Sequence, residues 1–223
     1  MKFFIGDKEY NYSDKQLGLQ LINYGEEADV YKIKDKAVKI YNKECYKNRL
    51  DEETVEYFKT IKTNRLLLPI DTVYDENKKF NGHTTKFIEV GNKQAIRRMK
   101  ISKFLKEIQL LIDDTKLLTE LGITICDFDY EDILYGDGIY YCDSGSFERN
   151  KKFSSRKIEE ANKEEIHKLI IDELLCPVCN LSKKQLSKLK EMILSGEYIS
   201  DIFSYEEYKQ TDTVSSFIKR ITK

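Results

Sequence analysis

The apolar residues of this chain change their spacing near residue 90, and that change limits the folds available to it. Before residue 90, short apolar and β-branched runs predict strands. Residues 30–33 and 37–41 are expected to form a hairpin through Lys34-Asp35-Lys36. We also expect strands at residues 66–74 and 84–90 and a helix within residues 49–62.

After residue 90 the spacing becomes helical. Apolar residues recur every three or four positions from residue 100 to residue 121, which predicts a long amphipathic helix that ends at Gly122. A short hairpin around Gly136-Asp137-Gly138 follows, and further helices are expected with caps at Asn162, Ser182 and Ser204. Strands followed by helices predict an α+β fold with two parts, residues 1–90 and residues 91–223.

Composition limits the expected partners and compartment. The 223 residues carry a formal net charge of −1, with the signs interspersed, so no bulk attraction draws the chain to nucleic acid or an anionic membrane. The N-terminus meets charge too early for a signal peptide, and no run approaches the ~20 apolar residues of a membrane span. Five cysteines, an odd number, fit reduced thiols. We therefore expect a cytoplasmic protein that binds neither nucleic acid nor membrane.

A glycine turn and a strand lysine form the first motif with possible chemistry. Gly25 precedes Ala28 and Val30, which share one strand face, and Ala37 shares a face with Lys39 on the next strand. Small and branched residues of this kind would cover a flat base while the lysine reaches phosphates, and the glycine would let the backbone approach the ligand. The alternative is an ordinary turn followed by an ordinary surface lysine.

Two acidic segments form the second and third motifs. The first acidic segment, Asp127-Phe128-Asp129-Tyr130-Glu131-Asp132, follows the long helix. Its four carboxylates repel one another unless a cation or solvent screens their charges. Asp143-Ser144-Gly145 ends the hairpin that begins at Ile133, so that hairpin returns Asp143 toward Asp132. Hard oxygen ligands of this kind suit Mg²⁺ or Ca²⁺, and the alternative is a pair of solvated turns.

The order and spacing of the three motifs resemble the protein kinase superfamily over roughly residues 20–150. The resemblance implies a two-lobed α+β kinase-like fold that binds ATP and Mg²⁺, with Mn²⁺ as a substitute. Lys39 would hold the α- and β-phosphates and Asp127 would orient the attacking hydroxyl, as catalytic residues. Asp132 and Asp143 would hold the metal. The nucleotide would be bound by Gly25, Ala28, Val30, Ala37 and Lys39, and by a hinge containing Lys86, Phe87 and Ile88.

Several positions depart from the family pattern. Cys126 stands where the family has an arginine that senses activation-loop phosphate, and Asp132 replaces the metal-binding asparagine. The glutamate that pairs with Lys39 is open among Glu52, Glu53 and Glu56, with Glu53 favoured. No Ala-Pro-Glu motif follows Phe147, so the resemblance does not select a substrate.

The sequence therefore predicts an ATP-dependent phosphotransferase that moves the γ-phosphoryl group to a hydroxyl, with a Ser/Thr-type protein kinase as the favoured form. The acceptor, a protein or a small molecule, is left open. The alternative is a pseudokinase that acts as a nucleotide-binding or protein-interaction module. Cys176 and Cys179 have the spacing of zinc ligands, but no second pair accompanies them, which favours two cysteines at a helix end.

Overall fold

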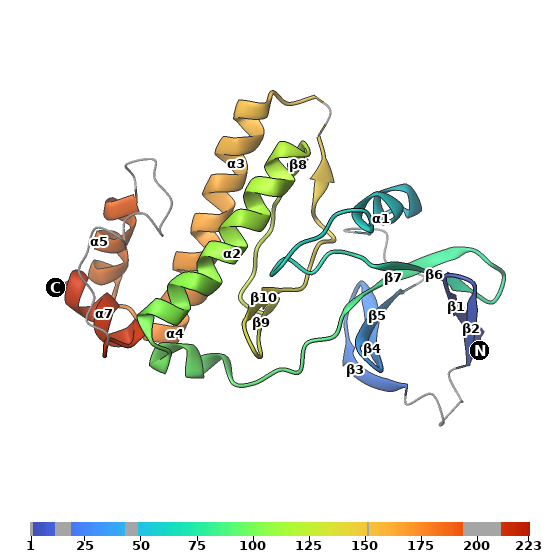
Figure 1. Ribbon diagram of the computed structural model, residues 1–223, viewed down its shortest axis with the longest axis horizontal. Coiled ribbons are helices and arrows are strands. Elements are labelled where there is room, and N and C mark those ends of the chain that lie inside the picture. The colour runs from blue at the N-terminus through green and yellow to red at the C-terminus, as the bar shows by residue number, and fades with distance from the viewer. Residues whose placement is uncertain (1, 12–18, 43–48, 151, 194–210) are drawn as a thin grey trace. The chain divides into compact units, whose positions relative to one another are not determined.

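The computed structural model describes residues 2–11, 19–42, 49–150, 152–193 and 211–223 (Figure 1). The chain divides into two compact units. Unit 1 comprises Met1–Thr63, Leu67–Glu89 and Cys142–Ser146, and unit 2 comprises Asn64–Leu66, Val90–Tyr141 and Phe147–Lys223. The α+β class expected from the sequence is confirmed, because unit 1 is built on an antiparallel sheet and unit 2 is largely helical.

The sheet of unit 1 has seven strands within the described ranges. They are β1 (Lys2–Ile5), β2 (Lys8–Asn11), β3 (Gln20–Tyr24), β4 (Ala28–Ile33), β5 (Lys36–Tyr41), β6 (Asp71–Asp75) and β7 (Phe80–Lys86). Their spatial order is β2-β1-β6-β7-β5-β4-β3. The hairpin predicted around Lys34-Asp35-Lys36 is confirmed, with Lys34 in the left-handed region at φ 56°.

One face of this sheet is buried in an apolar core. Its members come from β1, β4, β5 and β6 and are Phe3, Ile5, Ile33, Val38, Ile40 and Val73. Burying one such side chain stabilises the fold by about 1.5–3 kcal/mol, so alternation along β5 fixes the register of the strand. A slip of one residue would turn Lys39 into the core in place of Val38.

Three expected elements of unit 1 differ in extent. The strand expected at residues 84–90 is β7, which begins and ends four residues earlier, at Phe80 and Lys86. The helix expected within residues 49–62 is the shorter α1 (Glu52–Phe58), which is capped by the Asp51 side chain accepting a hydrogen bond from the Thr54 N–H at 2.7 Å. The strand expected at residues 66–74 begins only with β6 at Asp71. Pro69 explains the delay, since it has no N–H to donate to a ladder.

Unit 2 is built around two long helices that pack side by side, α2 (Ile101–Glu120) and α3 (Ser155–Lys168) (Figure 1). The predicted long helix is confirmed in α2, and Gly122 follows its end with φ 73°. The remaining elements are the 3₁₀-helix η2 (Lys93–Arg98), the π-helix η3 (Leu169–Leu175), α4 (Cys176–Cys179), α5 (Lys183–Ile193), α7 (Val214–Ile221), and the strand pairs β8 (Ile123–Thr124) with β11 (Glu148–Arg149) and β9 (Ile133–Tyr135) with β10 (Ile139–Tyr141).

The expected helix caps had different outcomes. The Ser182–Gln185 cap is confirmed, with the Ser182 hydroxyl 2.9 Å from Oε1 of Gln185. The Asn162 cap is wrong, because α3 begins at Ser155 with Ser154 as its cap, and Asn162 lies inside the helix. The helix expected from Ser204 lies outside the described residues. None of the helices within the described ranges is both long enough and apolar enough to cross a membrane.

Candidate functional site

The first group of candidate residues lies in unit 1 and centres on Lys39. Its Nζ lies 3.0 Å from Oδ1 of Asp143, a residue 104 positions later, and 3.9 Å from a carboxylate oxygen of Glu27. The Gly145 N–H donates to the same oxygen of Asp143 at 3.1 Å. The side chains of Lys39 and Asp143 are 20% and 27% exposed, so the pair is only partly screened by solvent. The fold thus brings together the strand lysine and the aspartate of Asp143-Ser144-Gly145.

The register of β4 and β5 sets the surroundings of Lys39. Val30 lies directly opposite Lys39, and Ala28 and Ala37 also occupy paired positions of this ladder. Residues directly opposed in an antiparallel pair, and their neighbours two positions away, share a face of the sheet. Ala28, Val30, Ala37 and Lys39 therefore lie on one face, opposite to the apolar core.

The turn before β4 requires the glycine at its start. The Gly25 N–H donates to the Ala28 carbonyl at 3.0 Å, and a Cβ added at Gly25 would lie 2.8 Å from that same oxygen. The Asn42 side chain donates to the carbonyls of Gly25 and Glu26 at 2.8 and 3.2 Å. These bonds hold the turn closed, and they bring the carboxylate of Glu27 near Lys39.

His83 was missed in the sequence analysis and lies directly opposite Lys39 on β7. Its ring is buried, and Nδ1 lies 3.0 Å from the Tyr41 hydroxyl. Burial, assisted by the charge of Lys39, lowers the pKa of His83 to about 3, and Asp143 opposes this shift. Burial likewise raises the pKa of Tyr41. Both groups therefore stay uncharged at neutral pH.

The expected hinge residues follow β7. The Phe87 N–H donates to the Asp35 carbonyl at 2.8 Å, so this N–H is already bonded within unit 1. The Phe87 ring lies 4.0 Å from Nζ of Lys32, Lys86 is exposed and Ile88 is buried.

The glutamates considered as partners of Lys39 lie on α1. Glu53 is exposed, Glu52 accepts a hydrogen bond from the Tyr74 hydroxyl at 2.7 Å, and Glu56 pairs with Lys59 at 2.7 Å. Among the described residues, the ion pairs of Lys39 are formed with Asp143 and Glu27. The pairing of Lys39 with Glu53 therefore stays a prediction from the resemblance.

The second group lies in unit 2, in the acidic loop formed by residues 127–132. Asp127 is exposed and adopts φ 63°, a left-handed conformation that costs a residue with a side chain of order 1 kcal/mol. Its neighbour Phe128 is buried, with ring centroids 4.3 Å from Tyr141 and 6.1 Å from Phe147. The Tyr141 hydroxyl donates to the Asp127 carbonyl at 3.2 Å. Strained backbone of this kind clusters at functional positions, because the surrounding packing must hold it in place.

The other carboxylates of the acidic loop have different surroundings. Asp129 caps its own turn by accepting a hydrogen bond from the Glu131 N–H at 2.9 Å. Asp132 is half-buried, with a carboxylate oxygen 3.5 Å from the Tyr141 hydroxyl. Between Asp129 and Asp132, the Lys93 side chain donates a hydrogen bond to the Tyr130 carbonyl at 2.6 Å and so fixes the backbone there. Among the four carboxylates of the acidic loop, that of Asp129 accepts a hydrogen bond from the backbone of the turn.

Asn162 holds the chain just before the acidic loop. From inside α3, its Oδ1 accepts a hydrogen bond from the Ile125 N–H at 2.7 Å, and its Nδ2 donates to the Ile123 carbonyl at 2.8 Å. Nδ2 also donates to the Thr119 hydroxyl on α2 at 2.8 Å. One buried amide thus ties α2, α3 and the entry to the acidic loop together, and sequence reasoning had given it a different role.

The residues present fit a metal that arrives with a nucleotide. The described part of the chain contains no group of three or more His, Cys, Asp or Glu side chains arranged to hold a metal ion. Mg²⁺ bound with a nucleotide uses one or two protein carboxylates, and phosphate oxygens and water complete its shell. The described hydrogen bonds of Asp143 use Oδ1, and its Oδ2 is a hard oxygen of the required kind.

Comparison of the chain with protein-family models gives no match, and comparison with curated proteins gives none either.

Proposed function

We propose that this protein is an ATP-dependent phosphotransferase with a two-lobed protein-kinase-like fold, which transfers the γ-phosphoryl group to a hydroxyl. The observation that carries the proposal is the contact between Lys39 Nζ and Asp143 Oδ1 at 3.0 Å. The resemblance had named these two residues, 104 positions apart, as the phosphate-binding lysine and the metal-binding aspartate. Val30 and Ala37, half-buried on the same face as Lys39, provide the apolar surface that an adenine base would cover, and Ala28 on that face is buried.

In this proposal each group has one role. Lys39 donates to the α- and β-phosphates, and the resemblance assigns Asp143 and Asp132 as the carboxylates that would hold the Mg²⁺. Asp127 accepts or orients the proton of the attacking hydroxyl, and its exposed, strained position supports that role. The acceptor is a hydroxyl of a protein Ser or Thr or of a small molecule.

The first test separates nucleotide binding from general charge. Thermal unfolding of the wild type is measured with ATP and Mg²⁺, with ATP and a chelator, and without nucleotide. ATP with Mg²⁺ at ten times its dissociation constant should stabilise the protein by about 1.4 kcal/mol. Lys39→Met should abolish this shift, whereas Lys79→Met, which removes an exposed lysine of the same unit, should keep it. A full shift in a folded Lys39→Met variant would remove the proposed role of Lys39.

The second test separates binding from transfer. Asp127→Asn should keep the thermal shift with ATP and Mg²⁺ but reduce phosphoryl transfer by roughly 10²- to 10⁴-fold. The matched control is Asp129→Asn, two residues along the same loop, which should leave transfer within about tenfold of wild type because its carboxylate serves the turn. If Asp129→Asn gave the larger loss, the assignment of the acceptor-directed aspartate would be wrong.

A second candidate function is a pseudokinase, a binding module that keeps the fold without transfer. The surroundings of Lys39 favour it, since Glu27 competes with any phosphate for this lysine. Cys126 in place of the arginine before Asp127 points the same way. Autophosphorylation and transfer to a generic protein substrate decide between the two: ATP-dependent stabilisation without any transfer would establish the binding module.

A further inference from the structure

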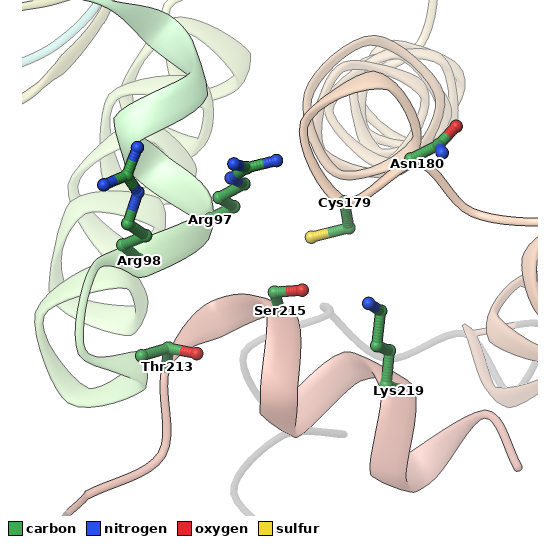
Figure 2. A pocket seen from close by; sticks show the side chains of 7 residues that line it. All are labelled: Arg97, Arg98, Cys179, Asn180, Thr213, Ser215 and Lys219. Carbon is green, nitrogen blue, oxygen red and sulfur yellow. The ribbon is translucent and has the colours of Figure 1, made fainter.

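Unit 2 contains a surface cavity that lies among three separate elements. Its volume is ≈380 Å³, and Figure 2 shows its lining: Arg97 and Arg98 from η2, Cys179 and Asn180 from the end of α4, and Thr213, Ser215 and Lys219 from α7 and its cap. The side chains of Arg97 and Lys219 extend into the space between the elements, and the Asn180 amide points away from it (Figure 2). None of these residues belongs to the groups around Lys39 or Asp127.

The lining is cationic, although the chain as a whole is not. In the described part of the chain the lining has seven residues, of which three are cations and none is a carboxylate, whereas the formal net charge of the whole chain is −1. Within the described residues, Arg97, Arg98 and Lys219 take part in none of the ion pairs. The neighbouring Arg220, by contrast, is held by Asp212 at 3.1 Å. Cations gathered without carboxylates repel one another, so an anion in the cavity would be stabilised.

The cavity is held by the backbone around it. The Val214 N–H donates to the Met99 carbonyl at 2.9 Å, and the Ile101 N–H donates to the Asp212 carbonyl at 3.0 Å. These bonds fix the first turn of α7 against the segment that follows η2. Ser215 lies next to the N-terminus of α7, where the helix dipole favours negative charge, whereas the Thr213 hydroxyl caps this helix by accepting a hydrogen bond from the Ser216 N–H at 3.3 Å.

Cys179 lines this cavity as an uncharged residue. Burial raises the pKa of its thiol to about 11, although the charges of Lys219 and Arg97 act in the opposite direction. The thiol therefore stays protonated at neutral pH and adds no negative charge.

We propose that this cavity binds the phosphate group of a small phosphorylated molecule. A phosphate group offers several acceptor oxygens and up to two negative charges, which matches the arginine donors of η2 and the lysine and hydroxyl donors of α7. A volume of ≈380 Å³ lies at the lower end of the range for small-molecule sites, so it accommodates a phosphate with a modest organic part. The lining is mainly polar, which favours a polar ligand.

The test is a titration with inorganic phosphate at constant ionic strength, followed by backbone amide spectra of ¹⁵N-labelled protein. Saturable shifts are expected at residues 97–98, 179–180 and 213–219. Arg97→Gln and Lys219→Gln should each weaken the binding by about tenfold, because each removes a charge-assisted hydrogen bond. The matched control is Lys188→Gln, which removes an exposed lysine from α5 and should change the affinity by less than about twofold.

Three outcomes would overturn the proposal. The first is the absence of saturable shifts at these residues, and the second is an equal loss of affinity in Lys188→Gln and Lys219→Gln, which would indicate attraction by general charge. The third concerns the source of the phosphate. A phosphothreonine peptide that binds at the same residues more than about tenfold tighter than inorganic phosphate would identify a protein partner instead of a small molecule.

Discussion

The burial of His83 opposite Lys39 predicts a specific loss of stability in mild acid. The perturbation is a change of pH from 7 to 5 in the wild type and in His83→Gln, which keeps a neutral polar group at the position but cannot titrate. The chain has only two histidines, His83 and His167, so the variant isolates one of them. Because the pKa of His83 in the folded protein is lowered, its neutral form is the one compatible with the fold.

The sign and size follow from proton linkage. The pKa of His83 is about 3 in the folded protein and near its ordinary value of 6.5 in the unfolded chain, so only the unfolded chain takes up the proton between these values. The stability is therefore fully present above pH 6.5 and is lost as the pH falls from 6.5 toward 3. Between pH 7 and pH 5 the unfolding free energy should fall by ~2 kcal/mol from His83 alone.

Two measurements check this prediction. Proton spectra of the two imidazole rings should show His83 unshifted down to pH 5, and the signal absent from His83→Gln identifies it. Urea unfolding at pH 7 and pH 5 should then show a fall in unfolding free energy that is ~2 kcal/mol larger in the wild type than in His83→Gln. Parallel pH dependence in the two proteins, or an imidazole signal of His83 that titrates near pH 6.5, would refute the reasoning.

Three further predictions concern the Lys39–Asp143 pair, Asn162 and Asp132. In a double-mutant cycle of unfolding free energy, Lys39→Met and Asp143→Asn should couple by about 1 kcal/mol, because the two side chains are close but partly exposed. Strictly additive losses of unfolding free energy would contradict this contact. Asn162→Ala should lower the unfolding free energy measured in urea by about 3 kcal/mol, because it leaves buried backbone groups unpaired. The control Glu164→Ala, at an exposed position of the same helix, should change it by less than about 0.5 kcal/mol. Equal losses in the two variants would contradict the structural role of Asn162. Asp132→Asn should keep the thermal shift given by ATP with Mg²⁺ and relax its dependence on metal, whereas Asp132→Ala should lose it, and identical behaviour would remove Asp132 from the metal site.

The elements that sequence reasoning found are those with strong local signals. The long helix α2 shows its period over twenty residues, and Gly122 provides a stop that needs φ 73°. The β4–β5 hairpin combines two β-branched runs with a short polar turn. In both cases, neighbouring residues contain all the information, so no knowledge of distant contacts was required.

The residues that sequence reasoning missed are buried polar groups whose partners are distant in the chain. Asn162 precedes Glu165 by three residues, which matches a capping box, yet its amide bonds to Ile123 and Ile125 from inside α3. Nothing local distinguishes a buried asparagine on a helix from an exposed one. His83 is similar, because its burial depends on the position of β7 beside β5, which the expected strand at residues 84–90 did not include.

The charges that pair with Lys39 lead to a prediction about metal dependence of the proposed site. Lys39 contributes one positive charge, and Asp143 and Glu27 contribute one negative charge each, so the group carries a net charge of −1 (one positive charge less two negative). A triphosphate without metal would meet this negative group and be repelled. A divalent cation at Asp143 changes the same sum to +1, and the phosphates are then attracted. A working phosphotransferase of this design must therefore bind ATP only with a divalent metal. A binding module that recognises adenine through the proposed surface of Val30 and Ala37 has no such requirement, so it would bind adenosine equally well in the presence of a chelator.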